Sequence, residues 1–169
     1  MMRLLTFCCA TLAACAVVAE ETRLLRHPDR HGNRTIFSYM GDVWIYDGKT
    51  PARRLTSHPA ADVRPKFSPD GRWVAFSSNR TGNWDVFVTP AEGGPPRQLT
   101  FHTASDLSVG WTPDSRAVIV YSGRDALFNW TLYKVPLSGA PPERLLKMFA
   151  AFGSFSSDGR FFAFNRRYP

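Results

Sequence analysis

The stretch FSPDGRWVAFSSNRTGNWDVFV, residues 67–88, contains two apolar runs separated by turn residues. Its Pro69-Asp70-Gly71 step favours a tight turn, because proline fixes φ, aspartate can accept a backbone hydrogen bond and glycine tolerates a positive φ. The run WVAF at residues 73–76 is apolar at every position, which is typical of a strand covered on both faces. We therefore predict strands joined by short turns in a sheet that is buried on both sides.

The same pattern returns twice along the chain. FSPDG at residues 67–71 corresponds to WTPDS at 111–115 and to FSSDG at 155–159, and successive copies are 44 positions apart. The elements RRLT (53–56) and RQLT (97–100) are also 44 positions apart. Ser115 stands where the other copies have glycine, so we expect a strained or different turn there.

A repeat of about 40 to 50 residues that contains four short strands is typical of a β-propeller blade. The clearest unit predicts strands at residues 63–68, 72–78, 84–89 and 97–100. Helical repeats of this length would need apolar residues three and four positions apart and would not tolerate so many turn residues. We predict an all-β fold, an incomplete β-propeller whose four-stranded blades span about 44 residues each.

The repeat divides residues 22–169 into blades at approximately 22–62, 63–106, 107–150 and 151–169, the last of them incomplete. In this alignment His27-Pro28-Asp29 of the first unit takes the place of Ser68-Pro69-Asp70. The stretch holds about 3.4 units, fewer than the four to eight blades of complete propellers. We therefore expect the amino-terminal piece of a longer protein, with an exposed apolar blade face and unpaired edges.

The first residues are predicted to be a targeting segment. Arg3 precedes an apolar run at residues 4–14, which is too short for a transmembrane helix and is typical of a signal peptide, here residues 1–19. Small residues before Glu20 fit ordinary cleavage, whereas LAAC at residues 12–15 fits lipid attachment to Cys15. We expect an exported, periplasmic protein without a transmembrane helix in the mature chain, or alternatively a lipoprotein anchored through Cys15.

Composition limits the classes of function. All three cysteines lie in the predicted signal segment, so neither an internal disulfide nor a zinc-cysteine cluster is expected in the mature chain. The net charge is +7, but the basic residues are dispersed among acidic ones rather than clustered. We therefore expect a solvated basic surface and no nucleic-acid partner.

No nucleophile elbow, metal-binding helix, phosphate loop or calcium loop is present, so we predict no catalytic, cofactor-binding or metal-binding residue and no cofactor. Several groups of possible site residues are better explained by structural roles. His58 and His102 are 44 positions apart, so the repeat explains them better than catalysis does. Asp42 and Asp85 could line a channel, but bonding within turns is the favoured interpretation. The remaining candidates are His27 and His31, the turn residues Asp70, Asp114 and Asp158, and the tryptophans Trp44, Trp73, Trp84, Trp111 and Trp130, which are expected in the core.

Four segments together resemble the amino-terminal propeller of tricorn-type serine proteases: RHPDRHGNRTIFSYMGDVWIYDG, RRLTSHP, FSPDGRWVAFSSNRTGNWDVFV and PAEGGPPRQLT. The resemblance extends from about residue 23 to the last residue. The most discriminating parts are HPDRHGN followed by GDVWI, directly after the signal segment. The chain departs from the pattern by ending in the fourth blade and by having Ser115 and Ser157 in place of the expected glycine and proline.

The resemblance implies a large peptidase with a six-bladed propeller, a second propeller, PDZ domains and a serine catalytic domain. The propellers would guide or filter peptide substrates, and the catalytic serine and histidine would lie beyond residue 169. The predicted function is a non-catalytic, peptide-binding portion of an exported peptidase, whose partners are peptides and the remaining domains of the same protein. The alternatives are a TolB-like periplasmic scaffold that binds proteins, and a prolyl-oligopeptidase-type propeller that gates an α/β-hydrolase.

Overall fold

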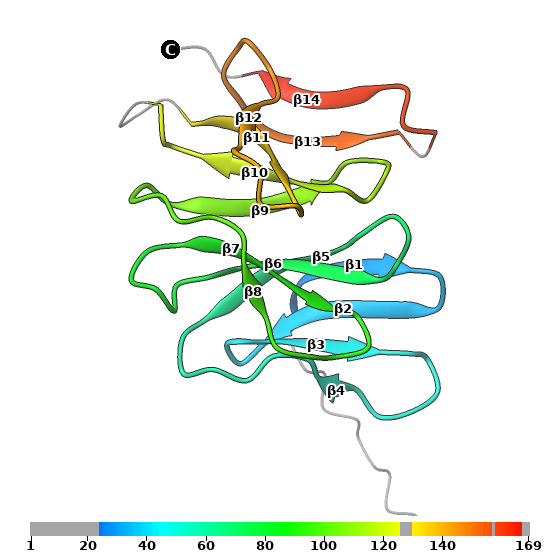
Figure 1. The fold of residues 1–169 in the computed structure, drawn as a ribbon. Coiled ribbons are helices and arrows are strands. Elements are labelled where there is room, and N and C mark those ends of the chain that lie inside the picture. The colour runs from blue at the N-terminus through cyan, green and yellow to red at the C-terminus, as the bar shows by residue number, and fades with distance from the viewer. Residues whose placement is uncertain (1–23, 126–129, 157, 167–169) are drawn as a thin grey trace, which may run out of the picture.

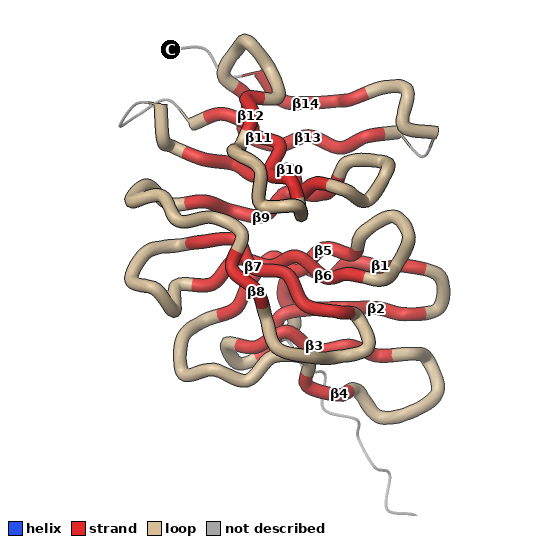
Figure 2. Tube along the Cα trace, in the orientation of Figure 1, coloured by secondary structure: helices blue, strands red, loops and turns tan. Residues whose placement is uncertain are grey.

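The computed structural model describes residues 24–125, 130–156 and 158–166, which form strands and loops and no helix (Figure 1, Figure 2). The first sheet has the order β1 (Arg26–His31), β2 (Arg34–Tyr39), β3 (Asp42–Tyr46) and β4 (Arg53–Arg54). The second has β5 (Asp62–Phe67), β6 (Trp73–Ser78), β7 (Asp85–Pro90) and β8 (Arg97–Gln98). The third has β9 (Asp106–Trp111), β10 (Ala117–Ser122), β11 (Thr131–Pro136) and β12 (Glu143–Arg144), and the last has β13 (Ala150–Phe155) and β14 (Phe162–Arg166).

Each sheet is antiparallel, with its strands paired in the order of the chain. The first strand of each sheet lies beside the first strand of the next, so β1 is next to β5, β5 is next to β9, and β9 is next to β13. Three complete blades and a two-stranded fourth sheet result, as Figure 1 shows. The predicted all-β propeller with an incomplete last blade is confirmed.

The strands of the second sheet match their prediction closely. The first three begin and end within one residue of the predicted bounds, and β8 has two residues where four were predicted. The fourth strand is short because only Gln98 and Arg97 pair with β7, at Phe87 and Val88. After β8, the backbone of Leu99 still bonds to β7, because Leu99 N donates a hydrogen bond to Val86 O at 2.8 Å.

The alignment of the first unit is wrong. His27, Pro28 and Asp29 lie inside β1, whereas their supposed counterparts Ser68-Pro69-Asp70 follow β5 in a turn. The first hairpin instead turns at residues 32–33, because His31 pairs with Arg34. The strand also contains an irregularity between Arg26 and Asp29, which a simple count of positions does not reveal.

The hydrophobic core lies between the sheets, in one cluster for each pair of neighbours. Val74 and Phe76 of β6 belong to the cluster shared with the first sheet, and Ala75 belongs to the cluster shared with the third. All three side chains are fully buried. The continuous apolar run of β6 therefore covers two interfaces at once, as its pattern predicted, and each large side chain buried in this way contributes about 1.5 to 3 kcal/mol.

The turns after β5, β9 and β13 share one set of hydrogen bonds. In the first of them, Asp70 Oδ1 accepts a hydrogen bond from Ser68 Oγ at 2.6 Å and another from Arg72 N at 3.0 Å. The other two turns repeat both bonds at Asp114 and Asp158. The aspartate therefore closes each turn through the backbone, which is the role predicted for it.

Ser115 adopts the backbone conformation of the glycines that it replaces. Its φ is +60°, close to the +69° of Gly71 and the +71° of Gly159. A residue with a Cβ atom is strained in this left-handed region, so the predicted strain is present. Ser115 Oγ also accepts a hydrogen bond from Asp70 N at 3.0 Å, which links the turns of the second and third blades.

No helix in the described part of the chain is long and apolar enough to cross a membrane. The predicted signal peptide at residues 1–19, Cys15 and Ser157 lie outside the described residues.

Candidate functional site

The two histidines 44 positions apart have the same structural role. His58 Nδ1 accepts a hydrogen bond from Ala60 N, and His102 Nδ1 accepts one from Ala104 N, both at 3.0 Å. Each histidine lies in the connection between the last strand of one sheet and the first strand of the next. The repeat therefore explains both residues, as predicted.

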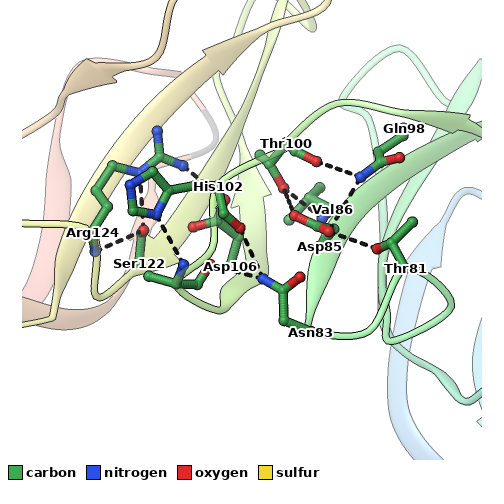
Figure 3. A network of polar contacts seen from close by, with 11 residues as sticks. Thr81, Asn83, Asp85, Val86, Gln98, Thr100, His102, Asp106, Ser122 and Arg124 are labelled. Carbon is green, nitrogen blue, oxygen red and sulfur yellow. Dashed lines mark hydrogen bonds and ion pairs between the residues drawn. The ribbon is translucent and has the colours of Figure 1, made fainter. Parts of the chain in front are cut away.

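Asp42 and Asp85 are buried at the starts of β3 and β7, but turn bonding describes them only in part. Asp42 Oδ2 forms an ion pair with Arg54 Nη2 at 2.5 Å, so its main partner lies in the fourth strand. Asp85 Oδ2 accepts hydrogen bonds from Thr81 Oγ1 at 2.7 Å and from Gln98 Nε2 at 3.2 Å, as Figure 3 shows. Only the Thr81 bond is to a turn residue. These carboxylates join the short outer strand to its sheet.

A second set of buried carboxylates was missed from the sequence. Asp62 and Asp106, the first residues of β5 and β9, are fully buried. Asp62 accepts hydrogen bonds from Arg80 Nη2 with both oxygens at 2.8 Å, and Asp106 Oδ2 accepts one from Arg124 Nη2 at 2.7 Å (Figure 3). Both the aspartates and the arginines are 44 positions apart, and that spacing was the available signal.

Each of these arginines also lies over an aromatic ring of its own sheet. The guanidinium carbon of Arg80 is 4.7 Å from the ring centroid of Phe87, and that of Arg124 is 4.7 Å from the ring centroid of Tyr133. The buried charge is thus matched by a carboxylate and by a ring face. Because the pair repeats with the blade and its partners among the described residues lie within the blade, we assign it to the fold.

The first strands of the four sheets line a cavity of about 590 Å³. Both first-blade histidines, His27 and His31, contribute to its wall, together with the charged residues Asp29, Arg30, Arg64 and Lys66. Phe152 and Phe155 of β13 supply apolar surface from the last sheet. Among the predicted candidates, therefore, the structure brings His27, His31 and Trp111 to a cavity and leaves His58, His102, Asp42 and Asp85 away from it.

All four first strands around the cavity have a bulge or shift of register where they pair with the second strand of their sheet. His27 has a φ of +52° and Arg64 a φ of +54°, at matching places in the bulges of β1 and β5. A bulge redirects a side chain relative to a regular strand. The cavity wall is thus built where the strands depart from regular geometry.

The electrostatics of the cavity are dominated by cations. Asp29 Oδ1 is 3.3 Å from Lys66 Nζ, and Asp29 Oδ2 accepts a hydrogen bond from Phe67 N at 2.8 Å. Burial lowers the pKa of His27, and the positive charges of Arg64, Arg26 and Lys66 lower it further. Among the described residues, no group of three His, Cys, Asp or Glu side chains is placed to hold a metal ion. The described wall of the cavity therefore carries more positive than negative charge.

Three of the five tryptophans lie in the core or at its margin, whereas Trp44 and Trp84 are partly buried and belong to none of the three core clusters. Trp111 is buried in the cluster between the second and third sheets, and its indole Nε1 donates a hydrogen bond to Lys66 O at 3.0 Å. Trp73 and Trp130 pack against the clusters on either side of the third sheet. For these residues the predicted core role is confirmed, and Trp111 also fixes the position of β5 beside β9.

Comparison with known proteins identifies relatives that are similar in sequence over part of this chain. Tricorn protease homolog 1 of Streptomyces coelicolor is 41% identical over 73 residues, which are 42% of this chain and 7% of that protein. The Tol-Pal system protein TolB of Bordetella pertussis is 40% identical over 47 residues, 28% of this chain and 11% of that protein. The chain thus spans only a small part of the curated relatives that it matches.

Solved structures of tricorn and TolB proteins are similar to this chain in fold. The crystal structure of the tricorn protease matches with a TM-score of 0.70 and 26% identity, over 80% of this chain and 14% of that chain. The structure of a TolB from Agrobacterium tumefaciens matches with a TM-score of 0.67 and 20% identity, over 79% of this chain and 50% of that one, and shows the fold alone.

The match to a protein family covers nearly the whole chain. Residues 22–169 match the family described as the Tricorn protease N-terminal beta propeller domain, which agrees with the predicted resemblance and with the sheets described above. The chain is a β-propeller scaffold and belongs to the Tricorn protease N-terminal beta propeller domain family.

Proposed function

We propose that this chain is a non-catalytic propeller portion of an exported, tricorn-like serine peptidase, and that it guides peptides toward a catalytic domain elsewhere in the same protein. The family match over residues 22–169 carries the proposal, because that family is named as the amino-terminal domain of a protease. The cavity between the first strands supplies a place for a peptide.

The coding sequence beyond Pro169 provides the first test. The proposal expects further blades of the same repeat and then a serine peptidase domain in the same reading frame. A stop without either in any frame would contradict it. A biochemical test complements this one: the purified chain should bind short peptides and leave fluorogenic peptide substrates intact. Turnover that serine-directed inhibitors abolish would show that the chain has a catalytic centre of its own.

Export is the second part of the proposal and rests on the first residues. A fusion of residues 1–19 to a periplasmic reporter should carry the reporter out of the cytoplasm, and reporter activity confined to the cytoplasm would overturn this part. Substitution Cys15→Ser distinguishes the two routes. If Cys15 carries lipid, the variant loses incorporation of labelled palmitate and is released from the membrane fraction, whereas ordinary cleavage leaves both unchanged.

The second candidate function is a TolB-like scaffold that binds proteins and cleaves nothing. The similarity to TolB proteins in sequence and fold favours it. The two candidates differ in the domain expected after the propeller, so the downstream coding sequence also separates them. An exported protein that ends with the propeller and copurifies with envelope proteins would support the scaffold.

A further inference from the structure

The two strained residues of the cavity wall carry the same kind of side chain. His27 and Arg64 are non-glycine residues in the left-handed region, with φ of +52° and +54°, and both are basic. They lie at the same place in β1 and β5, inside the bulges. Such strain persists only where the surrounding structure holds it, and it is concentrated at ligand sites in proteins. The strain is therefore a reason to ask what these two side chains bind.

Neighbouring strands hold this part of β5 firmly in place. Ser108 Oγ of β9 donates a hydrogen bond to Arg64 O at 2.9 Å, and Trp111 Nε1 donates one to Lys66 O at 3.0 Å. Ser108 N in turn donates to Ser77 Oγ of β6 at 2.8 Å. The backbone that carries Arg64 and Lys66 is thus fixed before any ligand arrives, which reduces the entropy lost on binding.

The positive charge on the wall is only partly neutralised, because Arg30, Arg64 and Lys66 face a single acidic residue there. Asp29 is the acidic residue of the cavity lining, and it is engaged by Lys66 Nζ at 3.3 Å and by Phe67 N at 2.8 Å. Arg64 forms no ion pair with any described residue, and its guanidinium carbon lies 5.7 Å from the ring centroid of Phe152. A half-buried guanidinium that has no carboxylate partner is stabilised when an anionic ligand supplies that partner.

We propose that Arg64 and Lys66, with the imidazole of His27 as a further hydrogen-bond donor, form an anion site in the cavity that binds the carboxylate side chains of an acidic, extended peptide. The planar guanidinium of Arg64 suits a carboxylate, which can accept two parallel hydrogen bonds from it. Phe152 and Phe155 offer apolar surface to the aliphatic parts of the same peptide. The cavity, at about 590 Å³, has the size of a site for a short peptide segment. The proposal deepens the peptide-guiding function and rests on it.

Binding of three matched peptides to the 169-residue chain tests the site. The probes are fluorescein-labelled octapeptides that alternate alanine with glutamate, glutamine or lysine, and the readout is fluorescence anisotropy at low and at physiological salt. We expect the glutamate peptide to bind about tenfold more tightly than the glutamine peptide, which is what one charge-assisted pair contributes. We also expect this preference to shrink as salt rises.

Three variants connect the preference to the cavity. Arg64→Gln removes the guanidinium, and Arg64→Gly removes it while allowing the positive φ without strain. Both should lose the preference for the glutamate peptide. Lys49→Gln is the matched control, because it removes one positive charge from an exposed turn away from the cavity. Circular dichroism and melting of each variant show that it is folded, and the glycine variant serves if the glutamine variant is not.

The outcomes separate this proposal from the one on which it rests. Equal binding of the glutamate and glutamine peptides, or a preference that survives both Arg64 substitutions, overturns the anion site and leaves the peptide-guiding function standing. If none of the three peptides binds, the peptide-guiding function fails, and the anion site fails with it. Tighter binding of a single-stranded oligonucleotide than of the glutamate peptide, lost with Arg64→Gln, would show a site for nucleic acid and would overturn the peptide proposal.

Discussion

The central strands of the blades, such as β6 and β10, differ in construction from the first strands, which line the cavity and which we call the channel strands. β6 and β10 pair with β7 and β11 without interruption, and their apolar residues fill the interfaces between sheets. The channel strands β1, β5, β9 and β13 are irregular, and one position in them is occupied in turn by His27, Arg64, Ser108 and Phe152. The regular repeat thus forms the fold, and the position where the repeat varies faces the cavity.

The largest effect on stability should come from removing a core side chain of the central strands. Phe76→Ala empties a fully buried position between the first two sheets, where the ring lies 5.9 Å from that of Phe87. A cavity of this kind costs about 3 to 5 kcal/mol in the free energy of unfolding, measured by urea titration. Phe101→Ala is the matched control, because Phe101 is 77% exposed and should change stability by less than about 0.5 kcal/mol. Equal losses in the two variants would contradict a core between the sheets.

The next effect concerns the ion pairs at the start of the channel strands. In the folded protein Asp62 binds Arg80 through both carboxylate oxygens. Asp62→Ala removes this partner of the buried guanidinium, so we expect the free energy of unfolding to fall by about 3 kcal/mol. Asp106→Ala should cost less, about 1 to 2 kcal/mol, because Asp106 Oδ1 is buried with no hydrogen-bond partner among the described residues and its removal relieves that penalty. Urea titration of both variants gives the comparison. A greater loss at Asp106 than at Asp62 would contradict it.

The third effect depends on pH and arises in the turn after β5. Burial alone would raise the pKa of Asp70, but the hydrogen bonds from Ser68 and Arg72 and the charge of Arg72 lower it to about 2. The folded-state pKa lies below the unfolded value, so this carboxylate stabilises the protein above about pH 4, and the contribution is lost as the pH falls toward 2.

Asp70→Asn tests that linkage. Since the side chain is 27% exposed and screened by solvent, we expect it to lower stability by about 1 kcal/mol at pH 6, as measured by urea titration. The difference from the parent should shrink as the pH falls from 4 to 2. A difference that stays constant across this range would show that the turn depends on the shape of the side chain rather than on its charge.

The sequence could predict the central strands because their spacing repeats. Phe67, Trp111 and Phe155 are 44 positions apart, so one well-defined unit gave the strands of the others. The predicted alignment of the first unit was wrong because His27-Pro28-Asp29 resembles the Ser-Pro-Asp turn, although it lies inside β1, in a bulge. The Gly32-Asn33 pair before Arg34 was the turn signal that could have corrected the alignment.

The candidate site was less predictable, for a physical reason. Repetition identified the structural role of His58 and His102, but a site formed by unlike residues has no repeat to reveal it. His27 and Arg64 are 37 positions apart instead of 44, because the first blade is shorter, and only the pairing of β1 and β5 with their neighbours shows that they correspond. The Asp62–Arg80 pair likewise depends on the antiparallel register that brings residues 18 positions apart together.

The smallest effect is expected at Ser115, where the repeated turn itself varies. Ser115→Ala keeps the strained φ of +60° and removes the acceptor for Asp70 N, so it should lower stability by about 1 kcal/mol. Ser115→Gly loses the same hydrogen bond but relieves strain of about 1 kcal/mol, so it should change stability by less than about 0.5 kcal/mol. The difference between the two variants in urea titration therefore measures the backbone strain. If alanine and glycine are equivalent, the strain is absent, and the link between the second and third blades alone explains the serine.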